Sequence, residues 1–148
     1  MDLRQSLLIM ISGSFVIHFF IMSTIMTNKT LNIRPSVGKF YMSVIMALLM
    51  GLLEVFMYDY DMGSISIFYY LFMGLMTVVF IYLYRNQLYI YDKEYLNEMI
   101  EHHSMALLTS EEILQKTESE RVKRLAENII STQQAEIEYM SKMLNVIY

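Results

Sequence analysis

Long apolar runs, separated by short polar segments, make up residues 1–90 of the chain. Three runs, over residues 7–27, 40–57 and 64–84, are each near the roughly 20 residues that a helix needs to cross a bilayer. The first intervening segment, residues 28–39, carries three basic side chains and the chain's single proline, and the second carries two aspartates and a glycine. This alternation predicts three transmembrane helices joined by two turns.

Residues 91–148 change to an amphipathic pattern. No glycine or proline follows Gly74, so the sequence leaves the third apolar run free to continue as a helix into this region. Two sets of residues recur at spacings of three, four and seven, which places each set on one face of a helix. The first set is Tyr95, Met99, His102, Ala106 and Ile113, and the second is Val122, Leu125, Ile129, Gln133, Glu136, Met140, Met143 and Ile147.

A polar stretch, Thr-Glu-Ser-Glu at residues 117–120, separates the two amphipathic helices. Thr117 or Ser119 can cap the second helix, and Thr117 and Glu120 have the spacing of a capping box, which typically starts a helix. We therefore expect an antiparallel hairpin that turns here. The predicted fold class is all-α, with a three-helix transmembrane domain in residues 1–90 and a water-soluble two-helix hairpin domain in residues 91–148.

The composition agrees with a chain of which about half lies in lipid, since 55% of the residues are hydrophobic and the mean hydropathy is +0.38. The charges are uneven: residues 1–90 hold five basic and four acidic side chains, and residues 91–148 hold six and eleven. A net charge of -4 without a basic run argues against nucleic acid as a partner. The absence of cysteine rules out disulfides, thiolate nucleophiles and thiolate metal sites.

Basic residues beside the apolar runs predict an orientation. Three lie in the first turn, and Arg85 and Lys93 follow the third run, whereas the second turn has none and the N-terminus has only Arg4. By the positive-inside rule, the N-terminus lies outside and the hairpin inside. His18 and Glu54 stand well inside apolar runs, where ionisable groups usually face a partner or a cavity, and the sequence leaves their role open.

The stretch most suggestive of chemistry is residues 99–103, Met-Ile-Glu-His-His. Adjacent residues on a helix point about 100° apart, so the two imidazoles are not expected to bind one ion together. Each histidine nevertheless has a candidate partner one turn before it, because Met99 precedes His103 and Glu98 precedes His102.

On the second helix, Gln133, Glu136 and Met140 form a polar and soft stripe within the apolar face. A hairpin that turns at residues 117–120 places residues near 102 opposite residues 134–137. Imidazole, thioether and carboxylate groups would then converge between the helices, and such a mixed set suits copper. The alternative interpretation is that these side chains only hydrogen-bond one another across the hairpin.

Two stretches of the hairpin resemble domain-of-unknown-function family 305. They are residues 95–110, Tyr-Leu-Asn-Glu-Met-Ile-Glu-His-His-Ser-Met-Ala-Leu-Leu-Thr-Ser, and residues 125–140, Leu-Ala-Glu-Asn-Ile-Ile-Ser-Thr-Gln-Gln-Ala-Glu-Ile-Glu-Tyr-Met. The methionine-rich run over residues 40–50 is also similar to the membrane-anchored branch of that family. The resemblance implies a ferritin-like helical domain, present here as half a bundle, and a link to copper, because some members are implicated in copper binding.

Carried over by position, the resemblance implies that the family-motif residues are His102, His103, Gln133, Glu136 and Met140. Helix spacing adds Met99 as a sixth candidate metal ligand. Two residues depart from the family pattern. Glu101 stands where the family has proline, which adds a carboxylate beside the histidine pair and could alter the ligand set. Glu54 interrupts the methionine-rich second run.

The sequence favours a membrane-anchored metal-binding protein that acts in copper storage, buffering or handover, with zinc or no metal as the other cofactor expectations. It has no Glu-x-x-His pair and no cofactor or nucleophile motif, so we do not expect an enzyme. The alternative is a non-catalytic structural membrane subunit whose hairpin mediates oligomerisation or docking. Expected partners are the lipid bilayer and either a second copy or a partner membrane protein, because two helices alone cannot bury both apolar faces.

Overall fold

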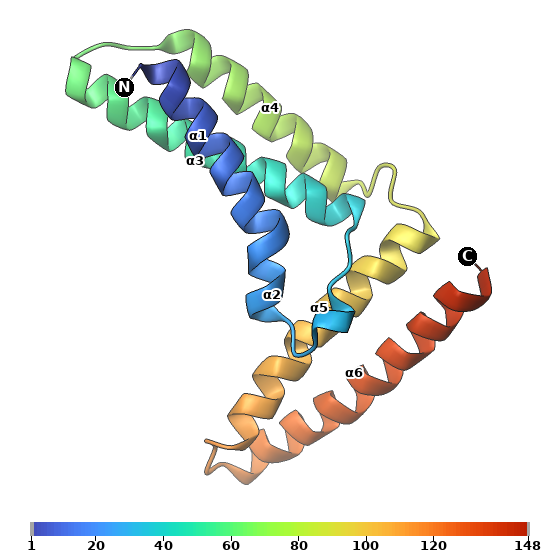
Figure 1. The fold of residues 1–148 in the computed structure, drawn as a ribbon. Helices are drawn as coiled ribbons and strands as arrows, with labels where there is room; N and C mark the ends of the chain where they lie inside the picture. The colour runs from blue at the N-terminus through green and yellow to red at the C-terminus, as the bar shows by residue number, and fades with distance from the viewer. Residues whose placement is uncertain (1, 148) are drawn as a thin grey trace. The chain divides into compact units, whose positions relative to one another are not determined.

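The computed structural model describes residues 2–147, and every regular element in this part of the chain is helical. The predicted all-α fold class is therefore confirmed. The elements are α1 (Leu3–Val16), the π-helical turn η1 (Ile17–Ile21), α2 (Met22–Met26), the 3-10 turn η2 (Thr30–Asn32), α3 (Val37–Met62), α4 (Ile67–Arg85), α5 (Asp92–Leu114) and α6 (Glu120–Ile147) (Figure 1).

Three segments are long and apolar enough to cross a membrane. They are Leu3–Met26, which comprises α1, η1 and α2, then Val37–Met62 and Ile67–Arg85. Many of their apolar side chains are exposed in the isolated chain, with Leu8 71% and Phe68 70% exposed. Exposure of such apolar surface to water costs free energy, whereas contact with lipid hydrocarbon does not. The three predicted spans are therefore compatible with membrane association.

The chain divides into two compact units. The first contains the chain up to Ile21 together with Val37–Tyr89, and the second contains Met22–Ser36 together with the chain from Ile90 onward. The second unit thus includes the hairpin, and it also includes the loop that follows the first apolar run.

Within the first unit, α3 packs against both α1 and α4 (Figure 1). Ser43, Ala47 and Gly51 recur every fourth residue along α3 and are all buried. A Cβ atom at Gly51 would lie 2.9 Å from Met73 Sδ and 3.0 Å from Ile11 Cγ1. Small residues on α3 therefore let the neighbouring helices approach closely, as is common in membrane helix packing.

The two ionisable side chains inside the apolar runs both have hydroxyl neighbours in the first unit. The Ser6 hydroxyl donates to the Glu54 carboxylate, which joins α1 to α3. The His18 Nδ1 atom lies 3.5 Å from Ser43 Oγ. Each polar group thus has a hydrogen-bonding neighbour within the helices, as expected of polar groups that do not face lipid.

The third apolar helix does not run on into the hairpin, although no glycine or proline stands at its end. Gln87 and Tyr89 adopt positive φ values of 51° and 61°. The side-chain amides of Asn86 and Gln87 donate to the carbonyl oxygens of Tyr82 and Tyr84, each at 2.8 Å. Together with the positive φ values, these bonds close the end of α4 without a glycine or proline.

In the second unit, α5 and α6 lie side by side and antiparallel (Figure 1), and the predicted hairpin turn falls in residues 115–119. Thr117 Oγ1 accepts the Ser119 N–H at 3.2 Å, so it orders the loop instead of forming the predicted capping box with Glu120. The hairpin core consists of Leu96, Ile100, Leu107, Ile137, Met140 and Leu144.

The buried face of each hairpin helix is rotated from the face that the spacing predicts. On α5, Leu96 is buried and Tyr95 is 52% exposed; on α6, Ala126 is buried and Leu125 is 58% exposed. A shift of one residue corresponds to a rotation of about 100°. The rotation has a physical cause, because α5 is covered on two sides, by α6 and by residues 22–36.

Candidate functional site

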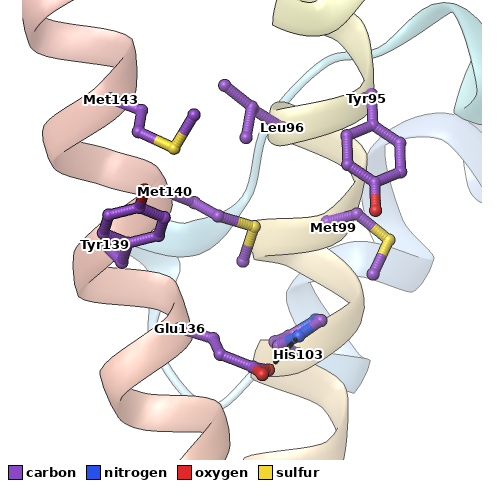
Figure 2. Close-up of a pocket in the computed structure, with 8 residues that line it drawn as sticks. All are labelled: Tyr95, Leu96, Met99, His103, Glu136, Tyr139, Met140 and Met143. Carbon is purple, nitrogen blue, oxygen red and sulfur yellow. Dashed lines mark hydrogen bonds and ion pairs between the residues drawn. The ribbon is translucent and has the colours of Figure 1, made fainter.

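A pocket of about 380 Å³ lies between the two helices of the hairpin. On each helix, the lining residues recur at spacings of three and four, which places them on one face of that helix. One face of α5 thus meets one face of α6. The lining residues are Tyr95, Leu96, Met99 and His103 from α5 and Glu136, Tyr139, Met140 and Met143 from α6. Figure 2 shows the His103–Glu136 pair at one end and the methionine sulfur atoms along the rest of the pocket.

His103 is a buried polar residue in the lining of this pocket. Its Nε2 atom lies 2.7 Å from Glu136 Oε2, and 10% of the His103 side chain and 50% of the Glu136 side chain are exposed. The other ring nitrogen, Nδ1, is buried and has no hydrogen-bond partner among residues 2–147. With Glu136 ionised, neutral imidazole donates its proton from Nε2, which leaves the Nδ1 lone pair free. A carboxylate that orients a histidine in this way is a common arrangement around metal-binding imidazoles.

Three thioethers line the same pocket as His103. Met99 lies one turn before His103 on α5, and Met140 and Met143 lie three residues apart on α6. Met140 is 8% exposed and belongs to the hairpin core. The pocket therefore offers one imidazole, one carboxylate and soft sulfur atoms from both helices.

Two of the six candidate metal ligands lie outside the pocket lining. His102 is exposed, and its ring centroid is 6.1 Å from that of His103. Gln133 is half-buried on α6. The structure thus brings together Met99, His103, Glu136 and Met140. It adds Met143, which the sequence analysis placed on the amphipathic face without naming it as a ligand; its position three residues after Met140 was the available signal.

Within residues 2–147, no three histidine, aspartate or glutamate side chains lie close enough to hold a metal ion together. Among these residues, His103 and Glu136 are therefore not joined by a third imidazole or carboxylate. The thioethers are the other sulfur, imidazole or carboxylate donors that line the pocket.

Glu101, the carboxylate that replaces the family's proline, does not join the pocket. Its side chain is 5% exposed and accepts hydrogen bonds from the Ser23 hydroxyl and the Arg34 backbone N–H. The expectation that Glu101 could alter the ligand set is not supported by this position. The carboxylate instead joins α5 to residues 22–36.

Comparison with known proteins places this hairpin in a wider group. Residues 83–144, which contain the whole pocket lining, match the family described as Domain of unknown function (DUF305). Uncharacterized protein L153 of Acanthamoeba polyphaga mimivirus is 34% identical over 144 residues, which make up 96% of this chain and 93% of that protein. The likeness to L153 therefore extends over the apolar helices as well as the hairpin. No solved structure matches the chain.

Proposed function

From the premise that this chain belongs to the DUF305 family, we propose that it is a membrane-anchored protein whose hairpin pocket binds a soft metal ion, with Cu(I) as the best fit. The role that suits such a site is storage, buffering or handover of copper and not catalysis. In the proposed orientation the N-terminus lies outside the membrane and the hairpin inside.

The observation that carries the proposal is the state of His103. Glu136 holds its Nε2 atom at 2.7 Å, while its Nδ1 atom is buried and unpaired among the described residues. A buried polar atom without a partner is costly, and a metal ion would supply the missing interaction. Among the candidate ligands, His103 is thus the one whose environment points to a bound ion.

The donors around His103 favour Cu(I) over zinc. Thioether sulfur is a soft ligand that selects Cu(I), and Met99 and Met140 offer it from both helices. Zinc sites are built from thiolate, imidazole and carboxylate ligands, of which the pocket has only His103 and Glu136. Zinc therefore remains the less suitable ion.

A specific feature favours the alternative of a structural subunit. Apolar side chains outside the pocket lining remain exposed on the hairpin, with Ile113 41%, Leu125 58% and Val146 85% exposed. Surface of this kind is typical of contact with another protein or a membrane. In this reading the pocket is only part of a packing interface, and the hairpin binds no metal.

Titration of the full chain in detergent with Cu(I), in competition with a chromophoric chelator, separates the two proposals. We expect about one equivalent to bind, and His103→Ala to lower the affinity by more than about a hundredfold because it removes the central ligand. His102→Ala is the matched control, since His102 is exposed outside the pocket, and it should bind as the wild type does. Equal copper uptake by wild type and His103→Ala would refute the site and favour the structural subunit.

A further inference from the structure

Residues 22–36 lie against α5 through buried hydrogen bonds that are separate from the pocket. Glu101 forms the first anchor. One of its carboxylate oxygens accepts the Ser23 hydroxyl, and the other accepts the Arg34 N–H at 2.8 Å. A buried carboxylate is costly to leave unpaired, so this contact fixes the segment to the helix.

Ser104 forms the second anchor and is fully buried. Its hydroxyl donates to Asn28 Oδ1 at 2.7 Å and accepts from the Asn28 N–H at 3.2 Å and from Asn32 Nδ2 at 3.3 Å. The Asn28 N–H also lies 3.3 Å from the Ser104 carbonyl oxygen. Asn28 therefore binds both the side chain and the backbone of α5 at this point.

The two anchors flank His103, since Glu101 lies two residues before it and Ser104 lies one residue after it. On a helix these positions point about 160° and 100° away from His103, so the anchors face residues 22–36 while the imidazole faces α6. A rotation of α5 that moved His103 away from Glu136 would also break the buried bonds of both anchors.

We infer that residues 22–36 are a positioning segment for His103: by binding Glu101 and Ser104, they fix the rotation of α5 and so hold the imidazole against Glu136. The effect on metal affinity rests on the proposed function, whereas the position of the imidazole can be observed without metal. Asn28 is a positioning residue in this account, because it lines no part of the pocket and acts through Ser104 and Glu111 of α5.

The test compares three variants of the full chain in detergent micelles. Asn28→Ala removes the oxygen that accepts the Ser104 hydroxyl, and Asn28→Asp keeps an oxygen in that place. Lys29→Ala is the matched control, since Lys29 is an exposed neighbour in the same loop. The chain has three histidines, so ring-nitrogen NMR of histidine-labelled protein gives few signals, and His103→Gln identifies the one of interest.

We expect Asn28→Ala to shift the His103 ring signals toward those of a solvated imidazole and to lower Cu(I) affinity about tenfold, as loss of groups that orient a ligand does. Asn28→Asp should restore both readouts in part, since its carboxylate still accepts the Ser104 hydroxyl but lies beside the Glu111 carboxylate. Lys29→Ala should change neither. A purely structural role for Asn28 would not move the ring signals of a histidine in another segment. Glu101→Gln, which weakens the other anchor, should shift the same signals.

Unchanged His103 ring signals in Asn28→Ala would overturn the inference, whatever the copper affinity. A wild-type chain that takes up no Cu(I), but whose His103 signals move in Asn28→Ala, would overturn the proposed function and support the positioning role. An equal shift of the His18 signals would indicate general unfolding of Asn28→Ala. In that case the Glu101→Gln variant tests the inference in place of Asn28→Ala. Unchanged His103 ring signals in Glu101→Gln would then overturn the inference.

Discussion

At the scale of single residues, the hairpin pocket depends on how His103 is held. Glu136 is half exposed and binds one ring nitrogen of the buried His103. A carboxylate that accepts the Nε2 proton favours the tautomer that keeps a free lone pair on Nδ1. In the proposed metal site, the methionines would determine which metal ion is preferred, and the carboxylate would only orient the imidazole.

Met140→Leu separates the proposed metal-binding role of this methionine from its packing role. Leucine fills nearly the same volume, so the free energy of unfolding should change by less than about 1.5 kcal/mol. The sulfur atom is lost, so Cu(I) affinity should fall about tenfold. Chelator competition and chemical unfolding measure the two effects. Met42→Leu, the same change in the first unit, should leave copper affinity unaltered; equal affinity of both variants and wild type would exclude Met140 as a ligand.

Much of the pocket could be predicted from the sequence, because helix spacing and an antiparallel turn place Met99, His103, Glu136 and Met140 near one another. Spacing alone could not tell which of the two adjacent histidines faces α6. That choice depends on the rotation of α5, which Glu101 and other buried contacts with residues 22–36 set. These contacts join residues far apart in the sequence and leave no periodic signal.

At the scale of helices, the apolar runs predict the three membrane-length segments well, because length and the absence of charge are local properties of the sequence. The end of α4 was harder to predict. It is set by the amides of Asn86 and Gln87, which bond to nearby carbonyls without any glycine or proline. The buried face of α5 is offset by one residue from the predicted face, since a second covering segment, residues 22–36, lies outside the repeating pattern.

Gly51→Val tests the close packing of α3 in the first unit. A side chain at this position would clash with Met73 and Ile11, because the nearest atom lies only 2.9 Å from the new Cβ. We expect the free energy of unfolding to fall by about 1–3 kcal/mol, as overpacking typically causes. Unfolding in mixed detergent micelles measures it.

Gly74→Val is the matched control for that change, because a Cβ there meets no atom of residues 2–147 within 4 Å. It should leave stability nearly unchanged or slightly raised, since valine is a better helix former than glycine. Equal stability of the two variants would show that α3 is not held by close packing at Gly51.

At the scale of the whole molecule, the chain joins three apolar helices of membrane length to a hairpin that carries most of the charged side chains. The second unit combines the hairpin with residues 22–36, which comprise α2 at the end of the first apolar segment and the loop that follows it. This grouping favours a topology in which that loop and the hairpin share one side of the membrane. The distribution of basic residues predicts the same arrangement.

Labelling of single cysteines in sealed vesicles tests the topology, and the chain suits it because it has no cysteine of its own. We expect Lys29→Cys and Lys142→Cys to react with an impermeant maleimide from the same side, and Asp2→Cys from the opposite side. The reason is that three spans separate the N-terminus from the hairpin. Reaction of Asp2→Cys and Lys142→Cys from one side would contradict the three-span account.

X-ray absorption at the copper edge of the Cu(I)-loaded full chain tests the central claim most directly. Any sulfur around the metal must come from methionine, because the chain has no cysteine. The account predicts both nitrogen and sulfur neighbours, loss of the nitrogen shell in His103→Ala, and a weaker sulfur shell in Met99→Leu and Met140→Leu. A copper environment of nitrogen and oxygen alone, or one that these variants leave unchanged, would contradict a soft-metal site in the hairpin.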